Sequence, residues 1–115
     1  MATQDAGAID ELVRAYFGCY EIQDRVRIEP LVASGFRFSS PDDDHIDRAT
    51  YFEKCWPINE HTERIDIDAL FVTGDEALVR YVLHTKTGKR FRNVEVVRVA
   101  NGQVVEVEVY FGPKT

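Results

Sequence analysis

The chain has 115 residues and a formal net charge of −6, which comes from 20 acidic and 14 basic residues. This acidic balance, without a basic stripe, argues against binding to nucleic acid or to an anionic membrane. The length suits one domain, 1–115, with its own core, and the hydrophobic fraction of 44% is ordinary for a soluble globular protein.

The cysteines and the N-terminal residues bear on the compartment of the protein. Cys19 and Cys55 match no metal-ligand spacing, and we interpret them as buried thiols. Residues 1–7 show no basic segment followed by an apolar run, and no stretch reaches the length of a membrane span. We therefore expect a cytoplasmic protein.

The first part of the chain predicts two helices and a short strand. Residues 5–23 carry an apolar stripe at helical spacing, made of Ile9, Leu12, Val13, Tyr16, Phe17 and Tyr20. Residues 27–33 predict a short second helix, with Pro30 tolerated in its first turn. Residues 36–38 then alternate as a short strand that stops at residues 39–41.

A polar segment and a third helix follow. Residues 42–46 predict a loop, and Asp47 is a good N-cap for a helix over about 48–56. Phe52 and Trp56 share a face of that helix. Pro57 ends it, because the residue before a proline disfavours the helical region.

The second half of the chain predicts four strands joined by three tight turns. The strands cover residues 64–72, 77–84, 91–99 and 104–111. Period-two alternation bounded by glycine-containing turns is the signature of β-hairpins, and Asn101-Gly102 is its strongest short form here. We expect these strands to form an antiparallel meander.

Alternation assigns one side of each strand to the core. The expected core residues are Ile65, Ile67, Ala69 and Phe71 in the first strand, Phe91, Asn93, Glu95, Val97 and Val99 in the third, and Val105, Val107, Val109 and Phe111 in the last. The opposite side carries mixed charges that suit cross-strand pairs in water. Glu95 breaks the pattern, because an unpaired charge on an apolar face is costly.

The order of these elements predicts the fold class. Helices followed by a meander indicate an α+β domain, a cone-shaped (cystatin-like) roll with helices packed on a curved, mostly antiparallel sheet. Large aromatic residues are expected to line its inside: Tyr16, Tyr20, Phe38, Trp56, Phe91 and Phe111. Such a concave apolar pocket is the usual place for a ligand.

The whole chain resembles the nuclear transport factor 2-like superfamily, in its SnoaL-like and ketosteroid isomerase-like branch. The resemblance rests on the order and spacing of residues 14–17, 38–48, 51–57 and 101–112. It implies the cone-shaped fold and, by analogy, a homodimer, for which Val94 and Val96 on the outer sheet face are candidate contacts. It does not imply one reaction, since the superfamily contains enzymes, ligand binders and interaction modules.

The resemblance also suggests catalytic positions. In ketosteroid isomerases a helix tyrosine and a protonated acid donate hydrogen bonds to an oxyanion, and an aspartate before a proline moves the proton. Tyr16 and Glu95 match the first two groups. Ser40 occupies the position before Pro41, and a serine hydroxyl cannot replace a carboxylate base. Asp43, Asp44 and His45 are nearby substitutes, of which Asp43 and His45 are our candidates for proton transfer.

Our first hypothesis is a cofactor-independent isomerase, cyclase or dehydratase that acts on a small hydrophobic carbonyl compound. Tyr16 and Glu95 would polarise an oxygen, and Asp43 or His45 would transfer the proton. No cofactor is required, and the sequence shows no glycine-rich loop that could cradle a phosphate. No metal is expected, because the acidic segment fits neither an EF-hand nor a zinc site. The expected ligand contacts are Tyr20, Phe38, Ser40, Phe52, Trp56, Phe91, Asn93, Val97 and Phe111.

The second hypothesis is a non-catalytic ligand-binding or dimerisation module of the same fold, which the missing carboxylate before Pro41 favours. Each catalytic candidate also has a structural interpretation. Tyr16 can be a core aromatic, and Glu95 can pair with an arginine or bond to Tyr16. Asp43 and His45 can belong to a solvated loop.

Overall fold

The computed structural model of the protein describes residues 5–114. In chain order the elements are the helices α1 (Ala6–Ile22) and α2 (Arg25–Ile28), the 3-10 helix η1 (Glu29–Leu31), strands β1 (Val32–Ser40) and β2 (Asp43–Asp47), helix α3 (Arg48–Lys54), the 3-10 helix η2 (Trp56–His61), and strands β3 (Thr62–Thr73), β4 (Glu76–Thr85), β5 (Arg90–Ala100) and β6 (Gln103–Lys114). The predicted α+β class and the four-stranded meander are confirmed.

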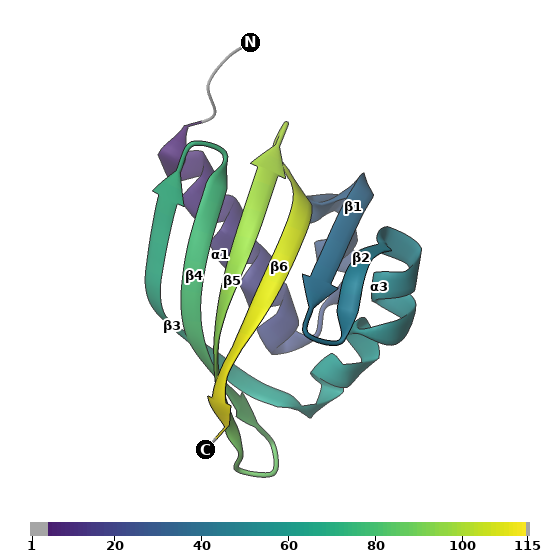
Figure 1. The fold of residues 1–115 in the computed structure, drawn as a ribbon, viewed down its shortest axis with the longest axis vertical. Coiled ribbons are helices and arrows are strands. Elements are labelled where there is room, and N and C mark those ends of the chain that lie inside the picture. Colours follow the sequence, from purple (N-terminus) through teal and green to yellow (C-terminus); the bar gives the residue numbers. More distant parts are fainter. Residues whose placement is uncertain (1–4, 115) are drawn as a thin grey trace.

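The strands form one curved sheet with the order β2-β1-β6-β5-β4-β3. Neighbouring strands are antiparallel except for β1 and β6, which run parallel. Helix α1 lies across the concave face behind β3 to β5, and α3 lies beside β1 and β2 (Figure 1). This arrangement is the predicted roll, in which the helices cover one face of the sheet. No helix within residues 5–114 is long and apolar enough to cross a membrane.

The core lies between α1 and the concave face of the sheet. The helix buries Ile9, Val13, Tyr16, Phe17 and Cys19, which recur at the spacing of one helical face. The sheet supplies short β-branched side chains opposite them: Val79, Val97, Val99, Val104 and Val107. Small residues on the strands and large aromatic residues on the helix let the two layers approach closely.

The chain between α1 and α3 differs from the sequence prediction. The expected helix over 27–33 ends at Leu31, and Val32 already belongs to β1. The expected loop over 42–46 was wrong, because strand β2 covers most of it and pairs with β1. β2 is an exposed edge strand, so the polar pattern that indicates a loop also suits a strand without a buried face.

Helix α3 begins where the sequence predicts. The Asp47 carboxylate accepts a hydrogen bond from the Thr50 N–H at 2.9 Å, which confirms the N-cap. The helix ends at Lys54, earlier than expected, and η2 carries the chain from Trp56 to His61 with Pro57 in its first turn. The turn of η2 positions several residues of the candidate site.

Two β-bulges change the predicted face of three residues. The register shift between Ile67 and Ala69 in β3 turns Leu70 and Val72 toward the core and leaves Phe71 67% exposed. The shift between Arg98 and Val99 against β6 makes Val104, rather than Val105, a buried residue. An extra residue in a strand inverts the alternation beyond it, so the core predictions for Ala69, Phe71 and Val105 were wrong.

Candidate functional site

A cavity of about 750 Å³ opens between the concave sheet face and the helical layer. Its size is within the range of small-molecule sites. Aromatic side chains from α1, β1, α3 and the meander make most of its wall: Phe17, Tyr20, Phe38, Tyr51, Tyr81, Phe91 and Phe111. Exposed residues of the β1–β2 turn, η2 and the β4–β5 hairpin also line it, so these segments form its rim.

A polar cluster lies on the sheet wall of this cavity. Tyr81 of β4 is paired in register with Asn93 of β5, and its hydroxyl donates diagonally to the Glu95 carboxylate at an oxygen–oxygen distance of 2.6 Å. The Asn93 amide donates to the Tyr81 hydroxyl at 3.3 Å. Glu95 is 9% exposed and forms no ion pair within the described residues. The acid is therefore held by a neutral hydroxyl and not by an arginine or by Tyr16.

The surroundings of Glu95 change its proton affinity. Burial raises the pKa of Glu95 to about 7, against the lowering effect of the Tyr81 hydrogen bond. Burial also raises the pKa of Tyr81 well above its ordinary value, so its hydroxyl stays a donor. Near neutral pH Glu95 is therefore present in both its protonated and its ionised form.

Tyr16 is fully buried and does not line the cavity itself. Its hydroxyl lies 3.1 Å from that of Tyr51 and 3.5 Å from that of Tyr20, and both of these partners line the cavity. Burial, and then the negative charge of Glu95, raise the pKa of Tyr16 well above its ordinary value. The structure thus places Tyr16 behind the cavity wall, where it can orient the Tyr51 hydroxyl.

Two more acidic residues line the cavity where the chain passes from β1 into β2, namely Asp42 and Asp43. Asp43 accepts hydrogen bonds from Lys54 at 2.5 Å and from the Ser40 hydroxyl at 3.3 Å. The hydrogen bond from Lys54 is the main cause that lowers the pKa of Asp43. Asp43 is therefore ionised at neutral pH, with Ser40, the residue before Pro41, as one of its partners.

The sheet register relates the two acids. Glu95 is paired with Val109 of β6, and Ser39 is paired with Glu108, which places Ser40 beside Val109 from the other side. Ser40 and Glu95 therefore flank Val109 on the concave face. Two strand spacings separate their backbones, about 10 Å. A small ligand lying over Val109 can reach both the Glu95 wall and the Ser40–Asp43 turn.

Some of the remaining predicted site residues line the cavity, and others do not. Among the expected ligand contacts, Tyr20, Phe38, Ser40, Phe91, Asn93 and Phe111 line the cavity, whereas Phe52, Trp56 and Val97 do not. Val97 is a core residue, and the Phe52 ring lies under the guanidinium groups of Arg25 and Arg48. Trp56 packs against Tyr20, a cavity residue.

His45 lies away from the cavity. It sits on β2 with a left-handed φ of 51°, and its exposed ring contacts Asp44 at 2.5 Å and Glu106 at 3.5 Å. These contacts are on the outside of the sheet edge, and His45 is not among the cavity-lining residues. The structure therefore brings Glu95 and Asp43 to one cavity but places His45 elsewhere.

Sequence reasoning missed Tyr81 and Asn59, which both line the cavity. A signal for Tyr81 exists: in the strand over 77–84 it alternates with Ala77 and Val79 and so faces the core. A tyrosine on that side, next to the strand that carries Glu95, is a candidate partner for the acid. Asn59 has no comparable signal, because it lies in a short polar connection.

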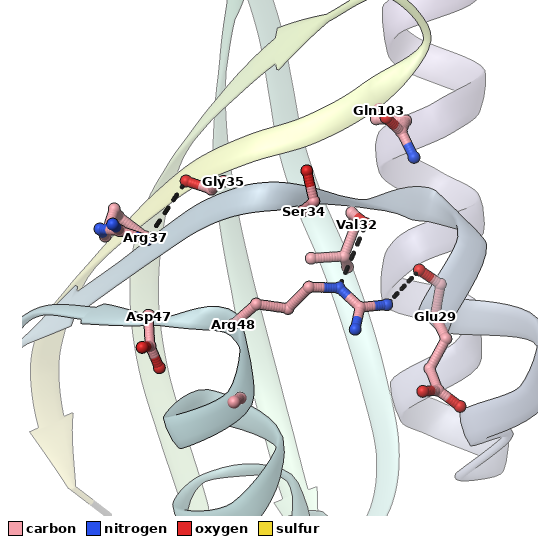
Figure 2. Close-up of a pocket in the computed structure, with 9 residues that line it drawn as sticks. Glu29, Val32, Ser34, Gly35, Arg37, Asp47, Arg48 and Gln103 are labelled. Carbon is pink, nitrogen blue, oxygen red and sulfur yellow. Dashed lines mark hydrogen bonds between the residues drawn. The ribbon is translucent and has the colours of Figure 1, made fainter.

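A second hollow, of about 710 Å³, lies at the outer edge of the molecule beside β1 and α3 (Figure 2). The Arg48 guanidinium crosses it and donates to the carbonyl oxygens of Glu29 at 2.8 Å and Val32 at 3.4 Å. These bonds tie the start of α3 to the start of β1. Because the Arg48 guanidinium already donates to backbone carbonyl oxygens, this hollow is a weaker candidate for a ligand site than the inner cavity.

Residues 42–47 include several side chains of the types that bind metal ions. Within residues 5–114 no three or more His, Cys, Asp or Glu side chains come close enough together to hold a metal ion. Asp43 and Asp44 bond to Lys54 and His45 instead. The carboxyl groups near the cavity are therefore best described by their hydrogen bonds and proton affinities.

The family model of the SnoaL-like domain matches residues 13–107. The chain belongs to this family. The matched residues contain Asp43, Glu95 and every element from β1 to β5. Among curated proteins, none matches the chain.

Solved structures share the fold of this SnoaL-like protein. An NTF2-like protein of unknown function from Mesorhizobium loti is 22% identical, with 98% of each chain covered and a TM-score of 0.79. A proposed ketosteroid isomerase from Kribbella flavida is 21% identical, with 93% of this chain and 79% of that chain covered and a TM-score of 0.77. AclR, a proposed hydroxylase from Streptomyces galilaeus, is 15% identical, with 94% and 91% covered and a TM-score of 0.78. These likenesses show the NTF2-like fold.

Proposed function

We propose that the protein is a cofactor-independent enzyme that transfers a proton on a small hydrophobic carbonyl compound, as an isomerase, cyclase or dehydratase. The observation that supports this proposal is that Glu95 and Asp43, two carboxyl groups in different environments, line one cavity. Burial raises the pKa of Glu95, whereas Lys54 lowers the pKa of Asp43. Two acids whose environments move their pKa values apart are typical of acid–base sites.

In this mechanism each acid has one role. Protonated Glu95 donates a hydrogen bond to the carbonyl oxygen, while Tyr81 holds its other carboxyl oxygen. Ionised Asp43 accepts a proton from the carbon next to the carbonyl, and the negative charge moves to the oxygen that faces Glu95. Asp43 then returns the proton to a carbon, or to a leaving hydroxyl group in a dehydration. Asp43 returns the same proton that it accepts, so the reaction needs no other reactant.

The hydrogen bonds of Asp43 limit the substrates that this mechanism allows. A carboxylate whose pKa is lowered is a weak base, so it can remove only a proton that the carbonyl makes acidic. The hydrogen bond from Glu95 supplies that activation. The aromatic wall favours an apolar ring beside the carbonyl, and the likeness to a proposed ketosteroid isomerase is in keeping with such a compound.

Proton exchange tests the proposal directly. The purified protein is mixed with 2-tetralone in D2O, and deuterium uptake at the carbons next to the carbonyl is followed by NMR. We expect acceleration by the parent, and a loss of roughly a hundredfold or more in Glu95→Gln and in Asp43→Asn. Asp44→Asn is the matched control, because Asp44 is a neighbouring exposed acid outside the cavity lining. Exchange at the uncatalysed rate, or equal in all variants, would contradict the proposal.

The alternative function is a non-catalytic ligand-binding module. One observation favours it: Ser40 stands before Pro41, and the carboxylate to which Ser40 bonds, Asp43, is engaged by Lys54. A protein of this kind would bind 2-tetralone without accelerating the exchange. Measuring binding by calorimetry beside the exchange assay therefore separates the two functions.

A further inference from the structure

Asn59 stands apart from the other buried polar side chains within residues 5–114. It is 6% exposed, lies on η2 and lines the cavity, yet neither its amide nitrogen nor its amide oxygen has a hydrogen-bond partner. By contrast, buried Glu95 bonds to Tyr81, and buried Thr85 bonds to the carbonyl of Lys89. A buried amide without partners is destabilising and uncommon in folded proteins, so its presence calls for a reason.

The backbone fixes the position of this amide. The Asn59 carbonyl accepts the N–H of Thr62, which closes the last turn of η2. Ile58 and Thr62, its neighbours in the structure, also line the cavity. The side chain is therefore held at the cavity wall by a closed turn, where the polar group of a bound ligand would supply the two missing partners.

We propose that Asn59 recognises the polar group of the ligand and so determines its class. The amide N–H donates to a carbonyl oxygen of the ligand, and the amide oxygen accepts from an N–H or O–H beside that carbonyl. The ligand class is thus a compound with acceptor and donor side by side, such as a carboxamide, a lactam or a hydroxycarbonyl compound. This inference rests on the proposed function in that the cavity takes a small carbonyl compound, but it requires no proton transfer.

A pair of probes of nearly equal shape tests the inference. 2-Naphthamide offers an acceptor and a donor, whereas 2-acetonaphthone offers only the acceptor, and binding of each is measured by calorimetry. We expect the parent to bind 2-naphthamide about tenfold more tightly, because a site with a paired donor and acceptor discriminates against an analogue that leaves one unpaired. Asn59→Leu should abolish this preference. An unchanged preference in the variant would overturn the inference.

Thermal unfolding without ligand supplies an independent readout. Asn59→Leu should raise the Tm, because an apolar side chain of similar shape removes the unpaired amide. Asn93→Leu is the matched control: Asn93 lines the same cavity, but its amide bonds to Tyr81, so its loss should lower the Tm. A lowered Tm in Asn59→Leu would show that the amide has a structural partner and would overturn the inference. If Asn59→Leu does not fold, the binding of the two probes is measured with Asn59→Ala instead.

The outcomes separate this inference from the proposed function. If the naphthamide preference depends on Asn59 but 2-tetralone shows no accelerated exchange, the enzyme proposal fails and the Asn59 assignment stands. If exchange is accelerated but the preference is absent or independent of Asn59, the Asn59 assignment fails alone. If neither naphthyl probe binds the parent, the assignment of Asn59 to ligand recognition is contradicted.

Discussion

Glu95 combines two properties that the fold alone does not require. It occupies a core position of β5, between Asn93 and Val97, where an apolar residue would stabilise the sheet more simply. Its one protein partner is a hydroxyl, and a hydroxyl does not compensate the ionised form as an arginine would. The position thus lowers stability when the acid is charged, and it keeps the acid able to donate a proton near neutral pH.

The burial of Glu95 predicts that the free energy of unfolding depends on pH. The unfolded acid loses its proton near its ordinary pKa of about 4.3, whereas folded Glu95 keeps it up to about 7. A raised folded pKa contributes stability at low pH that is lost as the pH rises through the folded value. Glu95→Gln cannot ionise and does not lose this stability. Its free energy of unfolding should therefore rise relative to that of the parent by about 2 to 3 kcal/mol as the pH increases from about 5 to about 8.

Urea unfolding of both proteins across that pH range measures the difference. Asp68→Asn serves as the control, because Asp68 forms an exposed ion pair with Arg80 on the outer face. Its effect on the free energy of unfolding should vary little with pH over the same range. A constant difference between parent and Glu95→Gln would mean that Glu95 titrates as an ordinary acid.

At the level of single residues, the sequence predicted the anomaly but not its partner. Glu95 was identifiable because it breaks an apolar alternation. Within its own strand Tyr81 conforms to the alternation like a core aromatic, so only its place next to the strand that carries Glu95 marks it as a candidate partner. His45 was expected near Asp43 because the two are close in sequence. Strand β2, with His45 in a left-handed conformation, instead directs its ring to the outside.

At the level of elements, alternation predicted the strands but not the irregularities between them. A bulge is a property of how two strands pair, and a single strand's pattern does not contain it. The same limit applies at the end of β6, where Asn93 is paired with Phe111 but Phe91 with Lys114. This third bulge brings Gly112 against the backbone of Arg92 at the rim of the cavity.

Gly112 should accordingly tolerate no side chain. A Cβ atom there would lie 2.2 Å from the carbonyl oxygen of Arg92, which is backbone and cannot rotate away. We expect Gly112→Ala to lower the free energy of unfolding by about 1 to 3 kcal/mol. Gly35→Ala in β1 is the control, because a Cβ atom there meets nothing and the change should be neutral or slightly stabilising. Equal stabilities of the two variants in urea unfolding would contradict the assigned register.

At the level of the whole molecule, the outer face of the sheet carries an apolar patch. Phe71, Leu78 and Val96 are paired in one row across β3, β4 and β5, and Tyr110 is paired with Val94 in a nearby row. Phe71 and Tyr110 are 67% and 55% exposed. Contiguous exposed apolar residues of this kind commonly mark an interface.

We therefore predict a homodimer formed by this outer face. The face can meet its own copy about a two-fold axis, with the ion pairs Arg80–Asp68 and Arg98–Glu106 among its polar groups. Sedimentation equilibrium should give a dimer for the parent and a monomer for Val96→Glu. Val26→Glu, an exposed position on α2, should remain dimeric. A parent that sediments as a monomer would contradict this prediction.

The whole-molecule fold was the part most accessible from the sequence, since the helical stripe, the Asp47 cap and the meander turns all indicate one architecture. The cavity follows from the same elements, but its chemistry depends on which groups meet across strands. The bond from Tyr81 to Glu95 and the unpaired amide of Asn59 both depend on tertiary placement, which single-strand patterns do not report.

The titration of Glu95 tests most directly whether this residue is a buried acid that shares the cavity wall with Tyr81. NMR of the side-chain carboxyl carbon should give a pKa of about 7 for the parent. In Tyr81→Phe the pKa should rise further, because the hydrogen bond that favours the ionised form is removed. A carboxyl group that titrates near about 4.3 and does not respond to the loss of Tyr81 would contradict the account.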